Sequence, residues 1–212
     1  MKTLAVLSRK GGAGKTTVTL HLAVAATRRT VILDADPQRS AADWWRSRDA
    51  TSPELVEGGV ADLQDIQSAA AADGVELLVI DTRPSAQEDA QEAARAADLA
   101  LIVVKPTILD LRAVQATVDA VKAGRTPAAF LINQAPSGRG GVEAPIVKEA
   151  IEALGGYDLP VCPVILHARA SYHAALIDGR AVNETEPTGK AAKEIAALWA
   201  YVEGKLWPSA QR

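Results

Sequence analysis

The residues with the clearest chemical potential lie near the N-terminus, between Lys10 and Thr17, where the sequence reads Lys-Gly-Gly-Ala-Gly-Lys-Thr-Thr. An apolar run, Leu4–Leu7, precedes this segment, and a helix-period segment from Val18 to Ala26 follows it. An apolar strand, a glycine-rich turn that ends in Gly-Lys-Thr and a helix together form a phosphate-binding P-loop. A glycine-rich turn before an ordinary helix rarely supplies Gly-Lys-Thr at this offset as well, so we predict a phosphate site.

The residue types in this loop suit phosphate chemistry. Gly11, Gly12 and Gly14 lack a Cβ, which lets the backbone adopt positive φ and wrap closely around phosphate oxygens. Backbone N–H groups at the helix N-terminus face a bound anion, and the helix dipole favours it. Lys15 is placed to reach the β- and γ-phosphates, and the Thr16 hydroxyl to ligate Mg²⁺.

Carboxylates end two further apolar runs. Thr30–Leu33 leads into Asp34-Ala35-Asp36-Pro37-Gln38, and Leu77–Ile80 leads into Asp81. Carboxylates at the C-terminal ends of parallel strands lie at the mouth of the sheet, where α/β proteins bind ligands. The second run has the Walker B pattern, in which the acid holds Mg²⁺ through a water. For the first run, an Asp-Pro turn that merely ends a strand is the alternative.

These motifs need a sheet and helices to position them. Strands are predicted at the three apolar runs already named and at Leu99–Val104, Ala128–Ile132 and Val161–Leu166, with a weak strand at Leu55-Val56. Helices are predicted after the P-loop and at about 40–48, 62–72, 110–123, 142–154 and 189–206. We expect a single α/β domain over residues 1–212, a P-loop NTPase with a mostly parallel, twisted sheet flanked by helices on both faces.

Composition narrows the class of protein. The 212 residues are 48% hydrophobic and 4% aromatic, with a net charge of −3, which suits helices packed on a buried parallel sheet and argues against a strongly basic nucleic-acid domain. Cys162 is the single cysteine, so the chain has no disulfide framework, and a reducing cytoplasm is the natural compartment. The first predicted strand starts almost at Met1, and no apolar run approaches the ~20 residues of a membrane span, so we expect neither a signal peptide nor a spanning helix.

Lys10 adds a more specific signal, because an ordinary P-loop does not need a lysine at its start. The pattern Lys-Gly-Gly-x-Gly-Lys-Thr-Thr resembles the deviant Walker-A ATPases, which include ParA-type partition proteins, MinD-type division-site proteins and the nitrogenase iron protein. The resemblance spans nearly the whole chain and is nearest to small ParA-type proteins without an N-terminal helix-turn-helix extension. It implies a sandwich dimer in which Lys10 touches the phosphates of the ATP bound by the other subunit. A solvated loop lysine is the alternative.

The resemblance also implies roles for individual residues. Lys10, Lys15 and Asp36 would be catalytic, with Asp36 near the attacking water and Asp34 behind it, while Thr16 and Asp81 would hold Mg²⁺. Asn133 ends a predicted strand and would meet the adenine ring, although an Asn in a turn is an equal alternative. The ATP-binding set would also include the loop residues Gly11, Gly12, Ala13, Gly14, Lys15, Thr16 and Thr17.

The function implied by the resemblance is ATP-driven partition or positioning. An ATP-bound homodimer would bind nonspecific double-stranded DNA, and an adaptor protein bound to the cargo would stimulate hydrolysis, which places the protein in the cytoplasm on the nucleoid and not on a membrane. The candidate DNA contacts are Arg169, Arg180, Lys190 and Lys193. The cargo itself, whether plasmid, chromosome or protein cluster, stays open.

Other functions fit the sequence less well. A MinD-like membrane protein would use Trp199, Tyr201, Leu206 and Trp207 at an interface, but the helix that carries them lacks a basic bias, so a packed structural helix is preferred. A metal-cluster carrier needs paired cysteines, and a small-molecule kinase would need an acceptor pocket that no motif marks. Two local questions stay open: whether Trp44 and Trp45 are divided between core and surface, and whether Arg83, after the Walker B acid, is solvated or reports the γ-phosphate.

Overall fold

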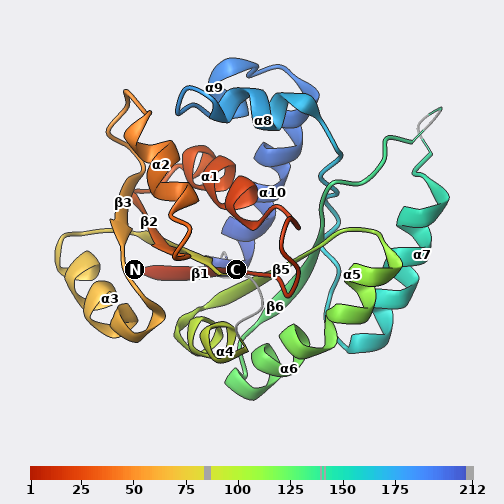
Figure 1. The fold of residues 1–212 in the computed structure, drawn as a ribbon, viewed down its shortest axis with the longest axis horizontal. Helices are drawn as coiled ribbons and strands as arrows, with labels where there is room; N and C mark the ends of the chain where they lie inside the picture. Colours follow the sequence, from red (N-terminus) through yellow and green to blue (C-terminus); the bar gives the residue numbers. More distant parts are fainter. Residues whose placement is uncertain (84–86, 139, 141, 209–212) are drawn as a thin grey trace.

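A parallel sheet forms the centre of the computed structural model, which describes residues 1–83, 87–138, 140 and 142–208. Its six strands lie in the order β3-β2-β4-β1-β5-β6, and every neighbouring pair is parallel (Figure 1). Five of them are runs of largely apolar residues, as expected of parallel strands buried on both faces. The strands are β1 Lys2–Leu7, β2 Thr30–Ala35, β3 Glu54–Glu57, β4 Leu77–Thr82, β5 Leu99–Val104 and β6 Ala128–Ile132.

Helices cover both faces of the sheet, which confirms the predicted fold class (Figure 1). One face carries α1 Lys15–Ala25, α2 Ser40–Arg46, α8 Ala170–Leu176, α9 Val182–Thr185 and α10 Lys190–Leu206. The other carries α3 Leu63–Ala72, α4 Gln87–Ala96, α5 Ile108–Ala113, α6 Gln115–Gly124 and α7 Pro145–Leu154, with short 3₁₀ turns at Val60–Asp62 and Gly155–Tyr157.

The period-two geometry of the strands divides the core between the two layers. In β1, Leu4 and Val6 pack into the layer under α1 and α10, whereas Ala5 and Leu7 pack into the layer under α4 and α6. β1 lies in the interior of the sheet, between β4 and β5. The loop that follows Leu7 is therefore anchored by a strand with partners on both sides.

One predicted strand is not a strand in the structure. The segment Val161–Leu166 runs beside β6 and donates two backbone hydrogen bonds to it, but it forms only isolated bridges. Pro160 and Pro163 lack the N–H groups that a continuous ladder needs, which explains the interruption. The prediction was right about the position of the segment and wrong about its regularity.

Two predicted helices differ at their boundaries. The helix expected at 110–123 begins at Ile108, because the Thr107 hydroxyl accepts a hydrogen bond from the Asp110 N–H and caps it, and it divides at Val114 into α5 and α6. The helix expected from Val142 begins instead at Pro145, in the first turn, where a missing N–H has no cost.

Packing decides how far the two adjacent tryptophans are exposed. Trp44 is 5% exposed in the core, and Trp45 is 36% exposed at the surface. The pair is therefore divided between core and surface, which is one of the two predicted arrangements.

The last helix packs against the body of the protein. On α10, Ile195, Leu198 and Trp199 are buried against the layer that contains α1, which agrees with a packed structural helix. Within the described part of the chain, no helix combines the length and apolarity that crossing a bilayer requires.

Candidate nucleotide site

The glycine-rich loop leaves β1 at the C-terminal edge of the sheet and ends at the first turn of α1. Gly12 has φ 74° and Gly14 has φ 91°, a left-handed conformation that favours glycine. A Cβ at Gly14 would also lie 2.3 Å from the Asn133 Nδ2 atom, so space excludes a side chain there as well. The loop thus has the curled backbone that the sequence predicts for anion binding.

Two amides that follow β6 hold this loop in place. Asn133 Nδ2 donates to the Ala13 carbonyl at 2.7 Å, and Gln134 Nε2 donates to the Gly12 carbonyl at 3.2 Å. Asn133 is buried, and its predicted contact with adenine stays a prediction. No local pattern indicates that these side chains hold the P-loop, because the contact joins positions 120 residues apart.

Buried charges of both signs meet beside the loop. Lys15 is 7% exposed and Asp81 is 1% exposed, while Asp36 is half-buried. β2 and β4 are neighbours with Asp34 opposite Asp81, so the three predicted acids share one edge of the sheet. Burial lowers the pKa of Lys15 below its ordinary value, and the Asp81 and Asp36 carboxylates oppose this shift.

Asp81 is the most perturbed acid of this cluster. Burial raises its pKa to about 7, the Thr16 hydroxyl and the Lys15 ammonium pull the pKa down, and Asp34 and Asp36 push it up. Thr19, one helical turn after Thr16 and on the same face of α1, donates to Asp81 Oδ1 at 3.5 Å. Sequence analysis missed Thr19, although its spacing from Thr16 was a usable signal.

The second Asp81 oxygen fits a cation site. Among the described residues, Asp81 Oδ2 is buried and has no hydrogen-bond partner. An orphaned carboxylate oxygen next to a threonine hydroxyl is a hard oxygen donor set, of the kind that Mg²⁺ prefers. The residues present are therefore compatible with a magnesium ion at this point.

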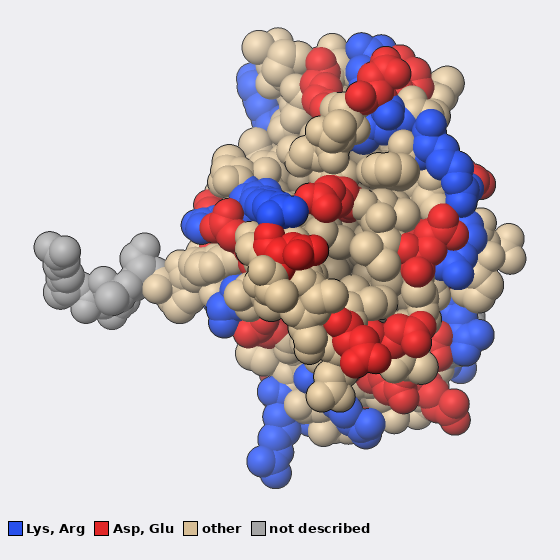
Figure 2. Space-filling model, turned by 90° about the vertical axis from the view of Figure 1, so that its left-hand side faces the viewer, with Lys and Arg blue, Asp and Glu red and all other residues tan. Residues whose placement is uncertain are grey.

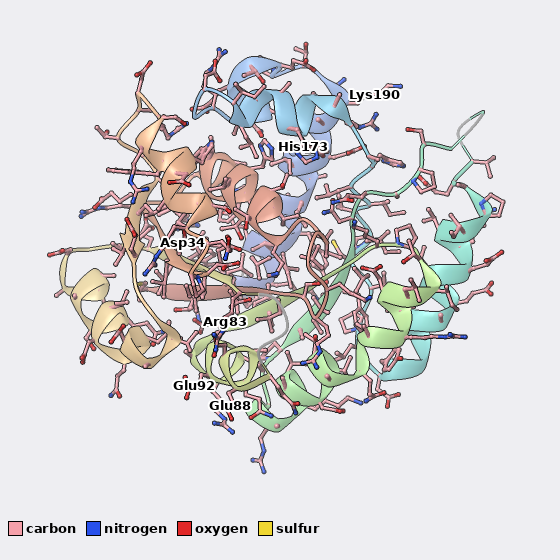
Figure 3. All side chains as sticks on the ribbon, in the orientation of Figure 1. Asp34, Arg83, Glu88, Glu92, His173 and Lys190 are labelled. Carbon is pink, nitrogen blue, oxygen red and sulfur yellow. The ribbon has the colours of Figure 1, made fainter. Side chains whose placement is uncertain are left out.

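Asp34 and Asp36 have different surroundings. Asp34 is fully buried and accepts from the Asp36 N–H at 3.1 Å and the Ala42 N–H at 2.9 Å, so both of its oxygens are occupied by backbone donors (Figure 3). Asp36 accepts from the Gln38 N–H at 2.9 Å and keeps part of its surface exposed. Asp34 therefore shapes the turn, while Asp36 has an oxygen available to the site.

Lys10 and Arg83 lie at the margin of this cluster. Lys10 is exposed, and its backbone N–H donates to the Ser8 hydroxyl at 3.3 Å. The Arg83 guanidinium follows β4 and pairs with Asp89 at the start of α4, with Nη2 3.0 Å from Oδ1 (Figure 3). Arg83 is thus exposed and ion-paired with Asp89. The two alternatives from the sequence, a solvated side chain or a contact with the γ-phosphate, did not include this ion pair. Pro84 and Ser85, the rest of that motif, lie outside the described residues.

A cavity of about 280 Å³ opens on the other side of the P-loop. His167 Nδ1 lies 2.8 Å from Glu194 Oε1, and the Tyr172 hydroxyl donates to Glu194 Oε2 at 2.9 Å. Arg169 also donates to Glu194, which fixes the wall of the cavity to α10. The lining comprises Thr17, Asn133, Gln134, His167, Ala168, Arg169, Ala170, Tyr172 and His173.

The cavity wall is the part of the site that sequence analysis recovered least. Arg169 was expected to contact DNA, whereas Glu194, the acceptor that Arg169 and Tyr172 share, was assigned no role. The contribution of His167 was also missed. A histidine after a strand-like segment and a glutamate on an amphipathic helix carry no local signal that they meet.

Comparison with known proteins agrees with this geometry. Residues 4–180 match the model of the CobQ/CobB/MinD/ParA nucleotide-binding domain. "Maintenance of carboxysome distribution protein A" of Gloeobacter kilaueensis is 30% identical, over 97% of this chain and 94% of the relative. Protein IncC of Escherichia coli is 26% identical, over 97% of this chain and 70% of the relative.

A solved structure shows the same fold. The septum site-determining protein MinD of Pyrococcus horikoshii, in complex with Mg-ADP, superposes with a TM-score of 0.76 at 19% identity, over 95% of this chain and 96% of MinD. The family model covers most of this chain, and the Gloeobacter relative is similar over almost its full length. The chain belongs to the CobQ/CobB/MinD/ParA family of nucleotide-binding proteins.

Proposed function

We propose that this protein is a Mg²⁺-dependent ATPase whose ATP-bound homodimer positions a cargo in the cell. The observation that carries the catalytic part is the arrangement at the sheet edge. A curled P-loop, a buried Lys15 and a buried Asp81 with one oxygen unpartnered among the described residues lie together. Such a group of opposite charges suits a polyphosphate bound together with a cation.

Each residue has a distinct role in this proposal. Thr16 and Asp81 would hold Mg²⁺, directly or through water, and the ion when bound neutralises phosphate charge. Lys15 contacts the β- and γ-phosphates and stabilises the charge that develops on them in the transition state. Asp36 orients the attacking water, and Asp34 holds the turn on which Asp36 lies.

The cavity beside Thr17 is assigned to the nucleoside. It lies at the other side of the P-loop from the acids, and it is lined by polar groups at the end of β6. Asn133 and Gln134 would contact the adenine base while their amides hold the loop carbonyls. Base binding and the shape of the phosphate loop are coupled in this arrangement.

A homodimer accounts for two exposed features of the same edge. Lys10 projects from the loop into solvent, where it could reach phosphates held by a second copy. Ile108 and Leu109, which begin α5 directly after β5, are each 61% exposed. A second copy would cover these apolar side chains, and Lys10 of the first copy would then contact the ATP that the second copy binds.

Asp36→Ala separates ATP binding from hydrolysis. Because Asp36 is assigned to the water, the variant should bind ATP with wild-type affinity, hydrolyse it roughly 10²- to 10³-fold more slowly, and accumulate as a dimer in size-exclusion chromatography with ATP. Asp34→Asn, which perturbs the buried turn, is the matched comparison and should also lower stability. Loss of ATP binding in Asp36→Ala would show that the acid has a different role.

Nonspecific double-stranded DNA is the matrix that we propose for the dimer. Arg169 and Arg180 are already paired, with Glu194 and Asp178, and therefore contribute little free charge. Lys190 and Lys193 are exposed in the first turn of α10, and neither has an acidic partner among the described residues. Figure 3 labels Lys190. On the side that carries β3 and α3, basic and acidic side chains alternate, which disfavours DNA there (Figure 2).

A charge-reversal pair tests this surface. Lys190→Glu/Lys193→Glu should abolish the ATP-dependent gel shift at low salt while leaving ATP hydrolysis intact, because two modest patches in a dimer supply all the phosphate contacts. Lys122→Glu, on α6, is the control and should bind DNA normally. Binding that ignores nucleotide, or no binding by the wild type with ATP, would reject DNA as the matrix.

The name of one relative motivates a proposal about the cargo and its adaptor. The Gloeobacter relative is named for carboxysome distribution, so we propose that the cargo here is a large protein assembly or a plasmid, linked through an adaptor that stimulates hydrolysis. A fluorescent fusion should lie on the nucleoid, and Lys15→Ala should disperse it through the cytoplasm. A fusion that stays on the nucleoid in Lys15→Ala would contradict ATP-dependent DNA binding.

A further inference from the structure

Lys105, at the end of β5, occupies a position next to the P-loop that no motif marks. β1 and β5 are neighbouring parallel strands with Leu7 opposite Ile102, so the chain leaves both strands at the same edge of the sheet. The Lys105 ammonium lies 3.9 Å from the point where a Cβ on Gly12 would be. The side chain of Lys105, the residue after β5, therefore ends beside Gly12 in the phosphate loop.

The charge of Lys105 is not neutralised by its surroundings. Lys105 is half-buried, and within the described ranges no carboxylate lies within ion-pair distance of its ammonium. The nearest acid in sequence, Asp110, instead accepts from the Thr107 hydroxyl at 2.6 Å in the cap of α5. A partly desolvated, unpaired ammonium at a loop built for anions indicates a site for an anion.

We propose that Lys105 is a second phosphate-binding lysine, which acts on the nucleotide bound by its own subunit. This inference rests on the proposed ATPase function and deepens it. Lys15 approaches the phosphates from the start of α1, and Lys105 approaches from the β5 side, across Gly12. Lys10, which is exposed on the same loop, serves the second subunit. The two lysines therefore have different targets. Lys105 binds phosphates of the nucleotide in its own subunit, and Lys10 binds phosphates of the nucleotide in the other subunit.

Gln134 and Lys105 approach Gly12 from β6 and β5. Gln134 binds the Gly12 carbonyl, and Lys105 faces the Gly12 α-carbon. Pro106, buried directly after Lys105, restricts the backbone conformation of Lys105. Side chains that follow two neighbouring strands therefore converge on Gly12.

Nucleotide affinity of the monomer tests this inference. At a protein concentration too low for dimers, Lys105→Met should weaken binding of a fluorescent ATP analogue with Mg²⁺ by roughly 10- to 100-fold, the loss expected for one charge-assisted hydrogen bond. Lys105→Arg should keep most of the affinity. Lys10→Met should bind like the wild type in the monomer and fail only in dimer formation, and Lys122→Met is the surface control.

The phosphate dependence separates a binding role from a structural one. Lys105→Met should weaken ATP and ADP but leave AMP affinity unchanged, whereas a distorted loop would weaken all three alike. Equal ATP affinity in Lys105→Met and wild type, or equal losses for all three nucleotides, would overturn the role of Lys105. Failure of the wild type to bind ATP would instead overturn the proposed ATPase, so the two failures are distinguishable.

Discussion

His21 gives the chain a buried group whose protonation opposes folding. The ring is fully buried in α1, Nε2 lies 3.0 Å from the Tyr172 carbonyl, and the Val182 N–H donates to Nδ1 at 3.2 Å. Nδ1 is therefore an acceptor and Nε2 the donor, so the neutral ring satisfies both contacts. A second proton would have to displace the Val182 N–H.

Burial lowers the pKa of His21 from 6.5 to about 4. As pH falls below 6.5, the unfolded chain takes up a proton before the folded chain does, and the unfolded state is favoured. The stability that neutral His21 supports is therefore complete above pH 6.5 and is lost as pH falls toward 4. Between pH 8 and pH 5 the loss amounts to about 2 kcal/mol of unfolding free energy, from the two pKa values.

Urea unfolding of nucleotide-free protein, followed by tryptophan fluorescence, measures this loss. His21→Gln keeps one donor and one acceptor but cannot titrate, so subtracting its pH profile removes the contribution of the other groups. The wild type should lose about 2 kcal/mol more than His21→Gln between pH 8 and pH 5. His173→Gln, at an exposed histidine, should follow the wild type. Parallel profiles for wild type and His21→Gln would refute the buried neutral ring.

Further substitutions test the site and the packing around it. Lys15→Ala should abolish ATP turnover, because it removes a buried charge from the phosphates, and near-normal hydrolysis would contradict the loop assignment. Asp81→Asn should lose the Mg²⁺ dependence of nucleotide affinity, measured by titration with and without EDTA. Arg48→Met should cost about 1 to 3 kcal/mol in urea unfolding, because the Arg48 side chain is 4% exposed and donates to the Ser52 and Gly179 carbonyls as well as to Glu184. Trp44→Ala should cost about 3 to 5 kcal/mol by leaving a cavity, whereas Trp45→Ala should cost much less.

The sequence by itself determined the framework of this protein and predicted where its phosphate site lies. The Gly-Lys-Thr loop, the Asp-x-Asp turn and the Walker B acid are local patterns, because each depends on a few adjacent residues at the end of one strand. The apolar runs specified a parallel sheet for the same reason, since burial on both faces demands continuous apolar strands. The prediction failed where prolines interrupt the segment Val161–Leu166, at the starts of α5 and α7, and for the unpredicted helices α4, α8 and α9.

Tertiary structure decided everything that depends on contacts between distant positions. Asn133 clamps the P-loop and Lys105 ends against Gly12 because β6 and β5 leave the sheet at the edge where the loop lies. The Glu194 network ties the cavity wall to the last helix for a similar reason. Local patterns cannot encode such contacts, because strand order and register set which ends meet, and these emerge only when the whole core packs.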